Sequence, residues 1–386
     1  MTFAVAARRL TVALGAALML LAAGCERVDV TGTTGEPVPM LFSTYSPRTT
    51  KADNSYVEAG TTTLPVNSSF GVFAFYQEGV MDSYTGAWAD LATKNWKPDF
   101  MFDQEVQFKG GTTYDYTPLR YWPSNEENTI SFWAYYPYGA YRPNDLSNSA
   151  LKFYDGIGAA YSATSTGLPK AEYTVNSDPA QQQDLMFDSF ASKDMTWDNC
   201  SESSSGTDGI APFNFRHALS AITFTIQMPT GAGTQGTDYF FEFNNLQLNN
   251  VPSTGKCADV SAATIAWSDQ GNPQDMSTTT YYSSAGMSDT FLLMPQTLPS
   301  TLTLDIDVLL KFPSADDPDN RSADLAYPFQ VSGVQMNTIE DASNNAITTW
   351  EAGKRYTYNI KLSLDKIEFS ATVAAWDAAT DVTIND

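Results

Sequence analysis

The sequence has one histidine, His217, and three cysteines among its 386 residues. So few of these side chains exclude a zinc site built with the usual histidine and cysteine spacing. The chain also lacks a glycine-rich phosphate loop, a dinucleotide-binding motif and a Gly-x-Ser-x-Gly nucleophile motif. We therefore expect no metal, no cofactor and no enzymatic activity, and we interpret His217 as a half-buried structural residue.

Positive charge is scarce as well. The chain has 21 Lys and Arg residues against 44 Asp and Glu residues, which gives a formal net charge of −23. Because proteins neutralise a phosphate backbone with Lys and Arg, this balance excludes a nucleic-acid partner. Charged residues make up only 17% of the chain, whereas Phe, Tyr and Thr are abundant and no segment keeps helical periodicity for three turns. This composition favours strands and loops.

Long hydrophobic runs are absent except at the N-terminus. A pair of arginines precedes the apolar run Leu10–Ala23, which is too short for a comfortable membrane span and is typical of a signal peptide. The run ends in Leu21–Cys25, which has the form of a bacterial lipobox. We expect cleavage before Cys25 and a lipid on its sulfur that anchors the protein to a membrane. An ordinary secretory signal that happens to contain a cysteine is the alternative.

Alternating apolar and polar residues predict many short strands. Phe70–Gln77 is apolar on both faces, which predicts a central buried strand. Phe213–Met228 alternates throughout, but the apolar positions change parity between Leu219 and Ile222, which predicts a bulge or bend. The alternation of Thr301–Leu310 predicts that its leucine and isoleucine side chains are buried.

Within Thr301–Leu310, we expect Leu304 and Ile306 to be buried and Asp305 and Asp307 to be exposed. In the long stretch 138–183, the sequence predicts at most one strand, near Ala171–Val175.

The distribution of strands predicts an all-β fold with two β-sandwich domains in tandem and few helices. A polar stretch around SESSSGTDG suggests the boundary between them. The predicted units are the signal peptide 1–24, a tether 25–37, an N-terminal domain 38–195, a linker 196–209 and a C-terminal domain 210–386.

Several weaker signals have two interpretations each. Cys200 and Cys257 could form a disulfide or remain two free thiols. The acidic loop Asp316–Asp324 could bind Ca²⁺ through carboxylate oxygens, but it lacks the EF-hand spacing and is more typical of a solvated turn.

Four tryptophans could stack on sugar rings or pack in the core. Trp88 and Trp96 lie in a polar loop and are the better candidates for sugar stacking. Trp122 and Trp133 lie within strand patterns, so we expect them in the core.

Five motifs occur in an order that resembles the fimbrillin family, the type V pilins. They are the lipobox at Cys25, an early strand with Arg48-Thr49 before FGVFAFY, RYWP followed by SFWAYYP, DLMF followed by FRHALSAITF, and the C-terminal WEAGKRYTYNIKLSLDKIEFSATVAAW. The resemblance covers nearly the whole mature chain. It implies two transthyretin-like β-sandwich domains, export as an outer-membrane lipoprotein, and assembly with other pilin subunits into cell-surface fimbriae that serve adhesion.

The resemblance also implies how subunits join. A protease cuts after an arginine that follows the first strand, and Arg48, with Thr49 after it, matches that position. The strand then leaves a groove, which a strand of another subunit fills by β-augmentation. The expected groove-filling side chains are Val38, Met40 and Phe42, and the expected donor, Ile367–Asp386, carries Ile367, Phe369, Ala371 and Val373.

A different class of function fits the same features. The chain could be a non-polymerising surface lipoprotein that binds glycans or a host or bacterial ligand. If it is a pilin, the sequence leaves open whether it is a stalk, tip or anchor subunit.

Overall fold

The computed structural model describes residues 39–45, 64–78, 95–123, 128–188, 194–196, 210–227, 240–262, 264–278, 286–287, 289–312, 325–362 and 367–376. Within these ranges the chain forms β-strands and short 3-10 turns, with no α-helix, which confirms the all-β prediction. In the same ranges, no helix has the length and apolarity needed to cross a membrane. Several predicted features lie outside the described residues: the signal peptide with Cys25, Val38, Arg48, Thr49, Trp88, Cys200 and the acidic loop Asp316–Asp324.

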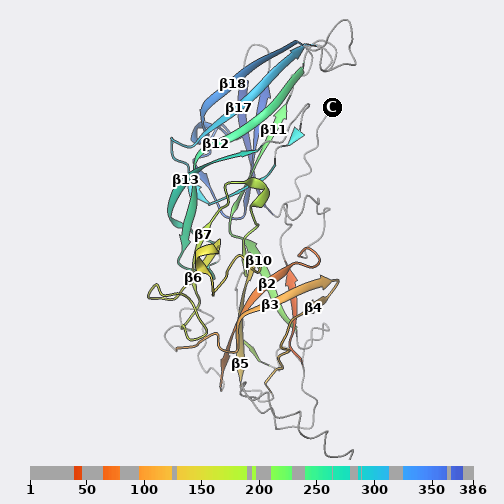
Figure 1. Cartoon of the computed structure of the whole chain (residues 1–386), viewed down its shortest axis with the longest axis vertical. Helices are drawn as coiled ribbons and strands as arrows, with labels where there is room; N and C mark the ends of the chain where they lie inside the picture. The colour runs from red at the N-terminus through yellow and green to blue at the C-terminus, as the bar shows by residue number, and fades with distance from the viewer. Residues whose placement is uncertain are drawn as a thin grey trace, which may run out of the picture.

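The N-terminal sheet forms the lower half of the elongated molecule (Figure 1). Its eight strands follow the order β1-β10-β8-β5-β2-β3-β4, with β9 also paired to β5. The bounds are β1 Leu41–Tyr45, β2 Ser69–Gln77, β3 Met101–Gly110, β4 Thr113–Asp115, β5 Thr129–Tyr136, β8 Met186–Asp188, β9 Asp194–Thr196 and β10 Ile210–His217.

Two further sheets, of five and six strands, form the upper half (Figure 1). One has the order β14-β11-β20-β21 with β15 on β11, and the other has the order β18-β17-β12-β7-β6 with β13 on β12. A short pair, β16 Gln296–Thr297 and β19 Thr349–Trp350, lies beside them. The remaining bounds are β6 Leu151–Tyr154, β7 Lys170–Thr174, β11 Ser220–Gln227, β12 Phe240–Cys257, β13 Ser268–Thr278, β14 Gly286–Met287, β15 Phe291–Leu293, β17 Thr303–Phe312, β18 Leu325–Gln335, β20 Lys354–Leu362 and β21 Ile367–Ala375.

Strand β2 is central, as its apolar sequence predicts. It pairs with β5 on one side and β3 on the other, and nearly all its side chains are buried. One face, with Phe70 and Val72, packs in a core enclosed by the N-terminal sheet. The other face, with Phe73 and Phe75, joins a second core that continues into the upper half of the molecule. The two halves therefore share apolar packing.

The predicted break between Leu219 and Ile222 is confirmed, and it marks the passage between the two halves. Strand β10 ends at His217 in the N-terminal sheet, and β11 begins at Ser220 in an upper sheet. The residues between them change the apolar parity because the buried face of each strand points into a different core.

The sheets do not divide at the linker predicted for residues 196–209. Strand β10 follows that segment but pairs with β1 and β8 of the N-terminal sheet. Strands β6 and β7 precede it but extend the upper sheet through β12. A polar segment indicates a surface loop, and it says nothing about which sheet the next strand joins. The domain limits 38–195 and 210–386 stay a prediction.

The prediction for β17 is confirmed for its apolar residues and differs for its aspartates. Leu304 and Ile306 are fully buried. Asp305 and Asp307 are only half-exposed, because the neighbouring strands cover them. Asp307 accepts a hydrogen bond from Gln330 at 2.8 Å, and the Asp305 carboxylate accepts one from the Gly333 N–H at 2.7 Å.

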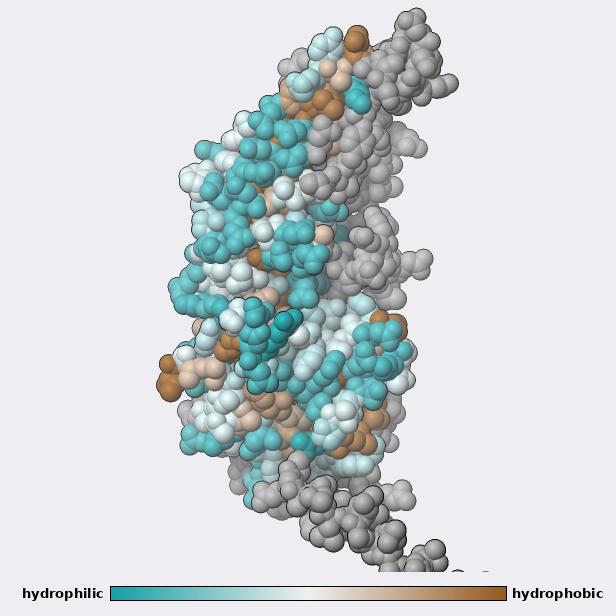
Figure 2. Space-filling model, in the orientation of Figure 1, coloured by the Kyte–Doolittle hydropathy of each residue, from teal (hydrophilic) through white to brown (hydrophobic). Residues whose placement is uncertain are grey.

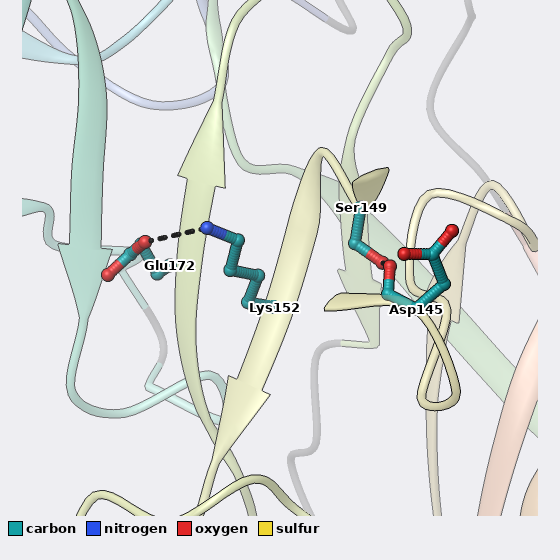
Figure 3. Close-up of polar contacts among 4 residues, drawn as sticks. All are labelled: Asp145, Ser149, Lys152 and Glu172. Carbon is teal, nitrogen blue, oxygen red and sulfur yellow. Dashed lines mark hydrogen bonds and ion pairs between the residues drawn. The ribbon is translucent and has the colours of Figure 1, made fainter. Parts of the chain in front are cut away.

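Strands β6 and β7 form a hairpin, whereas the sequence predicts only one strand in this region. Lys152 and Glu172 lie opposite each other on it and form an ion pair at 3.4 Å (Figure 3). Before β6, the Ser149 hydroxyl donates to the Asp145 carbonyl at 3.2 Å and closes the preceding turn. Both partners of the ion pair are about one-quarter exposed, so the pair contributes little to stability.

Candidate functional site

The first strand, β1, lies at the edge of the N-terminal sheet. It pairs with β10 in a parallel ladder of five residue pairs, from Leu41 opposite Ile210 to Tyr45 opposite Asn214. Among the described residues, no second strand forms a ladder with it. Parallel pairing is slightly less stable per residue than antiparallel pairing, so β1 is held by few backbone interactions for a strand with buried side chains.

The inward side chains of β1 fill the core of the N-terminal sheet. Met40 is 0% exposed and Phe42 is 2% exposed. The Phe42 ring stacks on Phe213 of β10 at 5.6 Å between centroids, and it also contacts Tyr116 at 5.2 Å and Phe132 at 6.1 Å. Leu41, between them, points outward and is 43% exposed. The alternation predicted for Met40 and Phe42 is thus present.

The outer edge of β1 is covered by tyrosine hydroxyls and one loop. The Tyr116 hydroxyl donates to the Met40 carbonyl at 2.9 Å, and the Met40 N–H donates to the Arg120 carbonyl at 2.9 Å. The Tyr114 hydroxyl accepts from the Thr44 N–H at 3.1 Å and lies 2.7 Å from the Thr44 hydroxyl. Burial raises the pKa of Tyr116, so its hydroxyl remains a donor at neutral pH.

These edge residues were not predicted as part of the site. The sequence feature next to them is the motif RYWP, which begins at Arg120 and is one of the five motifs of the family resemblance. Tyr114 and Tyr116 are two residues apart, so their side chains share one face of the segment that borders β1. A strand held by side-chain hydroxyls can leave without breaking a second backbone ladder.

The predicted donor residues lie on β21 in the upper half. Strand β21 pairs with β20 in an antiparallel ladder of nine residue pairs, from Lys354 opposite Ala375 to Leu362 opposite Ile367. Ala371 is buried, Ile367 and Phe369 are half-buried, and Val373 is 38% exposed. The structure therefore does not bring these side chains to the β1 groove, because they pack within their own sheet.

The end of β21 nevertheless reaches the upper end of β10. The Trp376 ring stacks on the His217 ring with centroids 3.8 Å apart and planes 3° apart. His217 Nδ1 lies 2.8 Å from the Asp184 carboxylate, and both side chains are almost fully buried. Burial agrees with a structural role for His217, although the side chain is buried more deeply than predicted.

The other predicted residues are not gathered into a site. Cys257 is a buried free thiol, and burial raises its pKa to about 11. Trp122 and Trp133 are in the core, as predicted, while Trp96 is half-buried and packs against it. In the described part of the chain, no three His, Cys, Asp or Glu residues are placed to hold a metal ion.

Comparison with known proteins gives consistent matches. The sequence matches a family model described as fimbrillin-like over residues 48–376. A segment of 89 residues is 30% identical to the fimbrium subunit Fim1C of Phocaeicola vulgatus, covering 23% of this chain and 21% of that subunit. The chain therefore spans about a fifth of that curated relative.

Two solved structures match the chain, and the first shows a similar fold. A fimbrial protein from Bacteroides vulgatus matches with a TM-score of 0.60 and 19% identity, over 88% of this chain and 99% of that one. A fimbrilin from Porphyromonas gingivalis matches with a TM-score of 0.40 and 10% identity, over 88% and 97% of the two chains. The family model spans most of the sequence, and on that ground this chain belongs to the fimbrillin-like family.

Proposed function

We propose that this chain is a fimbrial subunit that is exported as a lipoprotein through Cys25, reaches the outer membrane, and assembles on the cell surface by donor-strand exchange. Other pilin subunits are its partners, and the assembled fimbria serves adhesion to a host or bacterial surface. Family membership and the fimbrial relatives support the fimbrial part of this proposal. The lipobox Leu21–Cys25 supports the lipid anchor.

The observation that carries the exchange mechanism is the position of β1. It is a five-residue edge strand in a parallel ladder, yet it supplies the buried Met40 and Phe42 to the core. Its removal would expose the apolar surface around Phe213 and Phe132 together with the unpaired edge of β10. Such an edge binds another strand readily, because the new strand restores both the backbone ladder and the apolar contacts.

Cleavage after Arg48 would separate β1 from the rest of the chain. Arg48 lies three residues after the end of β1 at Tyr45. Before the cut, β1 fills its groove as part of the same chain, so the uncut protein stays monomeric. After the cut, only the five-pair ladder and the side-chain contacts hold β1 in place.

We place the donor segment in the C-terminal part of Ile367–Asp386. The first ten residues of this segment are committed to their own sheet through β20 and to the stack on His217. Donation of Ile367, Phe369, Ala371 and Val373 would first break the nine-pair ladder. Residues 377–386, which contain Val382 and Ile384 in alternation, can donate without that loss.

Processing and polymer size together test this proposal. The experiment compares wild-type protein, Arg48→Ala and Lys51→Ala on non-boiled gels, with N-terminal sequencing of the surface-exposed material. We expect polymer ladders that start at Thr49 for wild type and Lys51→Ala, and a lipidated monomer for Arg48→Ala. Wild-type polymers that retain the segment Cys25–Arg48 would contradict strand exchange at this groove.

A further inference from the structure

We propose that the Tyr114 hydroxyl makes the β1 groove selective for a replacing strand that carries serine or threonine at the position of Thr44. This inference rests on the proposed exchange of β1, and it adds a requirement on the sequence of the strand that takes its place. The partner is an extended segment with a hydroxyl side chain two residues away from the large apolar side chain that fills the Phe42 pocket.

The position of the Tyr114 ring does not depend on β1. Tyr114 lies in β4, which pairs with β3. Its ring contacts those of Phe70 and Phe108, with centroids 6.1 Å and 5.1 Å apart. Phe70 belongs to β2 and Phe108 to β3, so both contacts remain when β1 leaves. The hydroxyl is therefore held in place before a new strand arrives, and little ordering is needed when that strand binds.

The Tyr114 hydroxyl contacts both the backbone and the side chain of Thr44. Its oxygen accepts a hydrogen bond from the Thr44 N–H at 3.1 Å and lies 2.7 Å from the Thr44 hydroxyl oxygen. A tyrosine hydroxyl has a single proton. Because its oxygen already accepts the N–H, that proton is available to the Thr44 hydroxyl oxygen. A strand of almost any sequence supplies the N–H, whereas serine and threonine also supply the hydroxyl.

Tyr116 has a different role, because its hydroxyl bonds only to backbone groups in this region. It accepts from the Arg120 N–H at 3.2 Å and donates to the Met40 carbonyl at 2.9 Å. Every residue has a carbonyl, so this bond holds a strand without regard to its side chains. The two tyrosines thus divide the work, and Tyr114 alone distinguishes one side chain from another.

The pocket for Phe42 fixes which residue meets Tyr114. Phe42 lies opposite Ala211 of β10 and Thr44 lies opposite Phe213, so their side chains share one face of β1. A strand with a large side chain in the Phe42 pocket therefore places its residue two positions further along beside Tyr114. An apolar residue there would leave the Tyr114 proton without its acceptor at a part-buried site, which costs about tenfold in affinity.

Peptide competition tests this selectivity. The unlipidated full chain, Cys25→Ser, is cut after Arg48 with an arginine-specific protease, and the cut is verified by mass. It is then incubated with an excess of two synthetic peptides of residues 38–46 in equal amounts, one native and one with Thr44→Val. Valine has nearly the shape of threonine but lacks the hydroxyl. Native mass spectrometry, continued until the ratio of bound peptides is constant, gives the ratio of their affinities.

We expect the wild-type groove to hold about tenfold more native peptide than Thr44→Val peptide. A Thr44→Ser peptide should bind nearly as well as the native one, because it keeps the hydroxyl. The matched control is Ser43→Ala, which removes a hydroxyl from the opposite face of the strand and should compete equally with the native peptide. These comparisons use a single protein, so they do not depend on how a variant folds.

Two variants of the groove assign the preference to one hydroxyl. Tyr114→Phe and Tyr116→Phe each keep the aromatic ring and its packing. In Tyr114→Phe, the preference for the native peptide over Thr44→Val should disappear. In Tyr116→Phe, all peptides should bind more weakly while the tenfold preference remains, because the lost bond goes to a backbone carbonyl.

Failure of this inference differs from failure of strand exchange. Equal capture of the native and Thr44→Val peptides by the wild-type groove would overturn the selectivity and leave strand exchange intact. A preference that persists in Tyr114→Phe would overturn it as well, because its source would lie elsewhere. If no peptide binds to the verified cut protein, β1 does not exchange, and the proposed function fails together with this inference.

Discussion

Trp376 lies flat on His217, with ring centroids 3.8 Å apart, and so the end of the last described strand is fixed at the end of β10. His217 in turn contacts Asp184 at 2.8 Å. A residue of the upper half and two residues near the N-terminal sheet therefore share one buried cluster. The position of Trp376, at the end of β21, therefore depends on contacts with both halves.

Replacing Trp376 tests that dependence. Trp376 is 1% exposed, so Trp376→Ala would leave a large cavity and lower the free energy of unfolding by about 3–5 kcal/mol. Trp376→Phe keeps an aromatic ring over His217 and should lose clearly less. The measurement is urea unfolding followed by circular dichroism. Equal losses in the two variants would contradict this expectation, because they would mean that a phenyl ring at position 376 recovers none of the packing over His217.

Substitution of Phe42 tests how strongly β1 packs against the N-terminal sheet. Phe42→Ala removes a ring packed against Phe213, Tyr116 and Phe132, and we expect a loss of about 3–5 kcal/mol in the uncut protein. The neighbouring exposed Leu41 offers a matched control, since Leu41→Ala should change stability by about 0.5 kcal/mol or less.

In the cut protein, Phe42→Ala should also speed the release of β1, which size-exclusion chromatography with mass analysis can follow. Release at the wild-type rate would mean that the Phe42 contacts do not hold the strand.

Asp103 gives the protein a specific pH dependence. Asp103 is a half-buried residue of β3, and its carboxyl group accepts a hydrogen bond from the Tyr135 hydroxyl at 2.6 Å. Burial raises the pKa of Asp103 to about 7. The hydrogen bond from Tyr135 lowers this pKa, and the negative charge of Glu105 raises it by a smaller amount. Between about pH 4 and pH 7, the folded state therefore binds more protons than the unfolded state, and stability falls as the pH rises.

Asp103→Asn keeps an acceptor for Tyr135 and removes the titration. Between pH 5 and pH 8, the free energy of unfolding of the wild type should fall by up to about 3 kcal/mol relative to that of Asp103→Asn. The reason is that the pH rises by about two units before it reaches the pKa of Asp103 in the folded state. Urea unfolding of both proteins across this range provides the comparison. Parallel stability curves would mean that Asp103 does not bind a proton near neutral pH.

Lipidation is tested at Cys25. Cys25→Ala removes the only sulfur in the lipobox, so the precursor should no longer incorporate a fatty-acid probe and should leave the membrane fraction. Cys200→Ala serves as the control and should label as wild type does. Continued labelling of Cys25→Ala would contradict the lipoprotein prediction.

The sequence predicted those parts of the fold that local periodicity determines. Phe70–Gln77 is central and Leu304 and Ile306 are buried, because each side chain's face follows from its neighbours in the chain. The pairing of β10 with β1, and of β7 with β12, joins segments far apart in the sequence. No local pattern encodes such partners.

Local sequence patterns also predict only part of the candidate site. Alternation identified Met40 and Phe42, but the tyrosines that cover the β1 edge depend on how residues 114–121 fold over it. Strand β18 is a second example, since its apolar Leu325, Tyr327 and Phe329 are exposed. Figure 2 shows hydrophobic surface at the upper end of the molecule. An apolar residue on a strand is buried only where another layer lies over it.

The passage from β10 to β11 has a mechanical consequence for a molecule that is pulled along its long axis. The two strands are one continuous segment that crosses from the lower half to the upper half, and each is paired within a sheet (Figure 1). Tension applied to the two ends would pass through this covalent link and load the flanking ladders in shear, so that many hydrogen bonds must break together. A chain built this way would resist extension through the covalent link between its two halves.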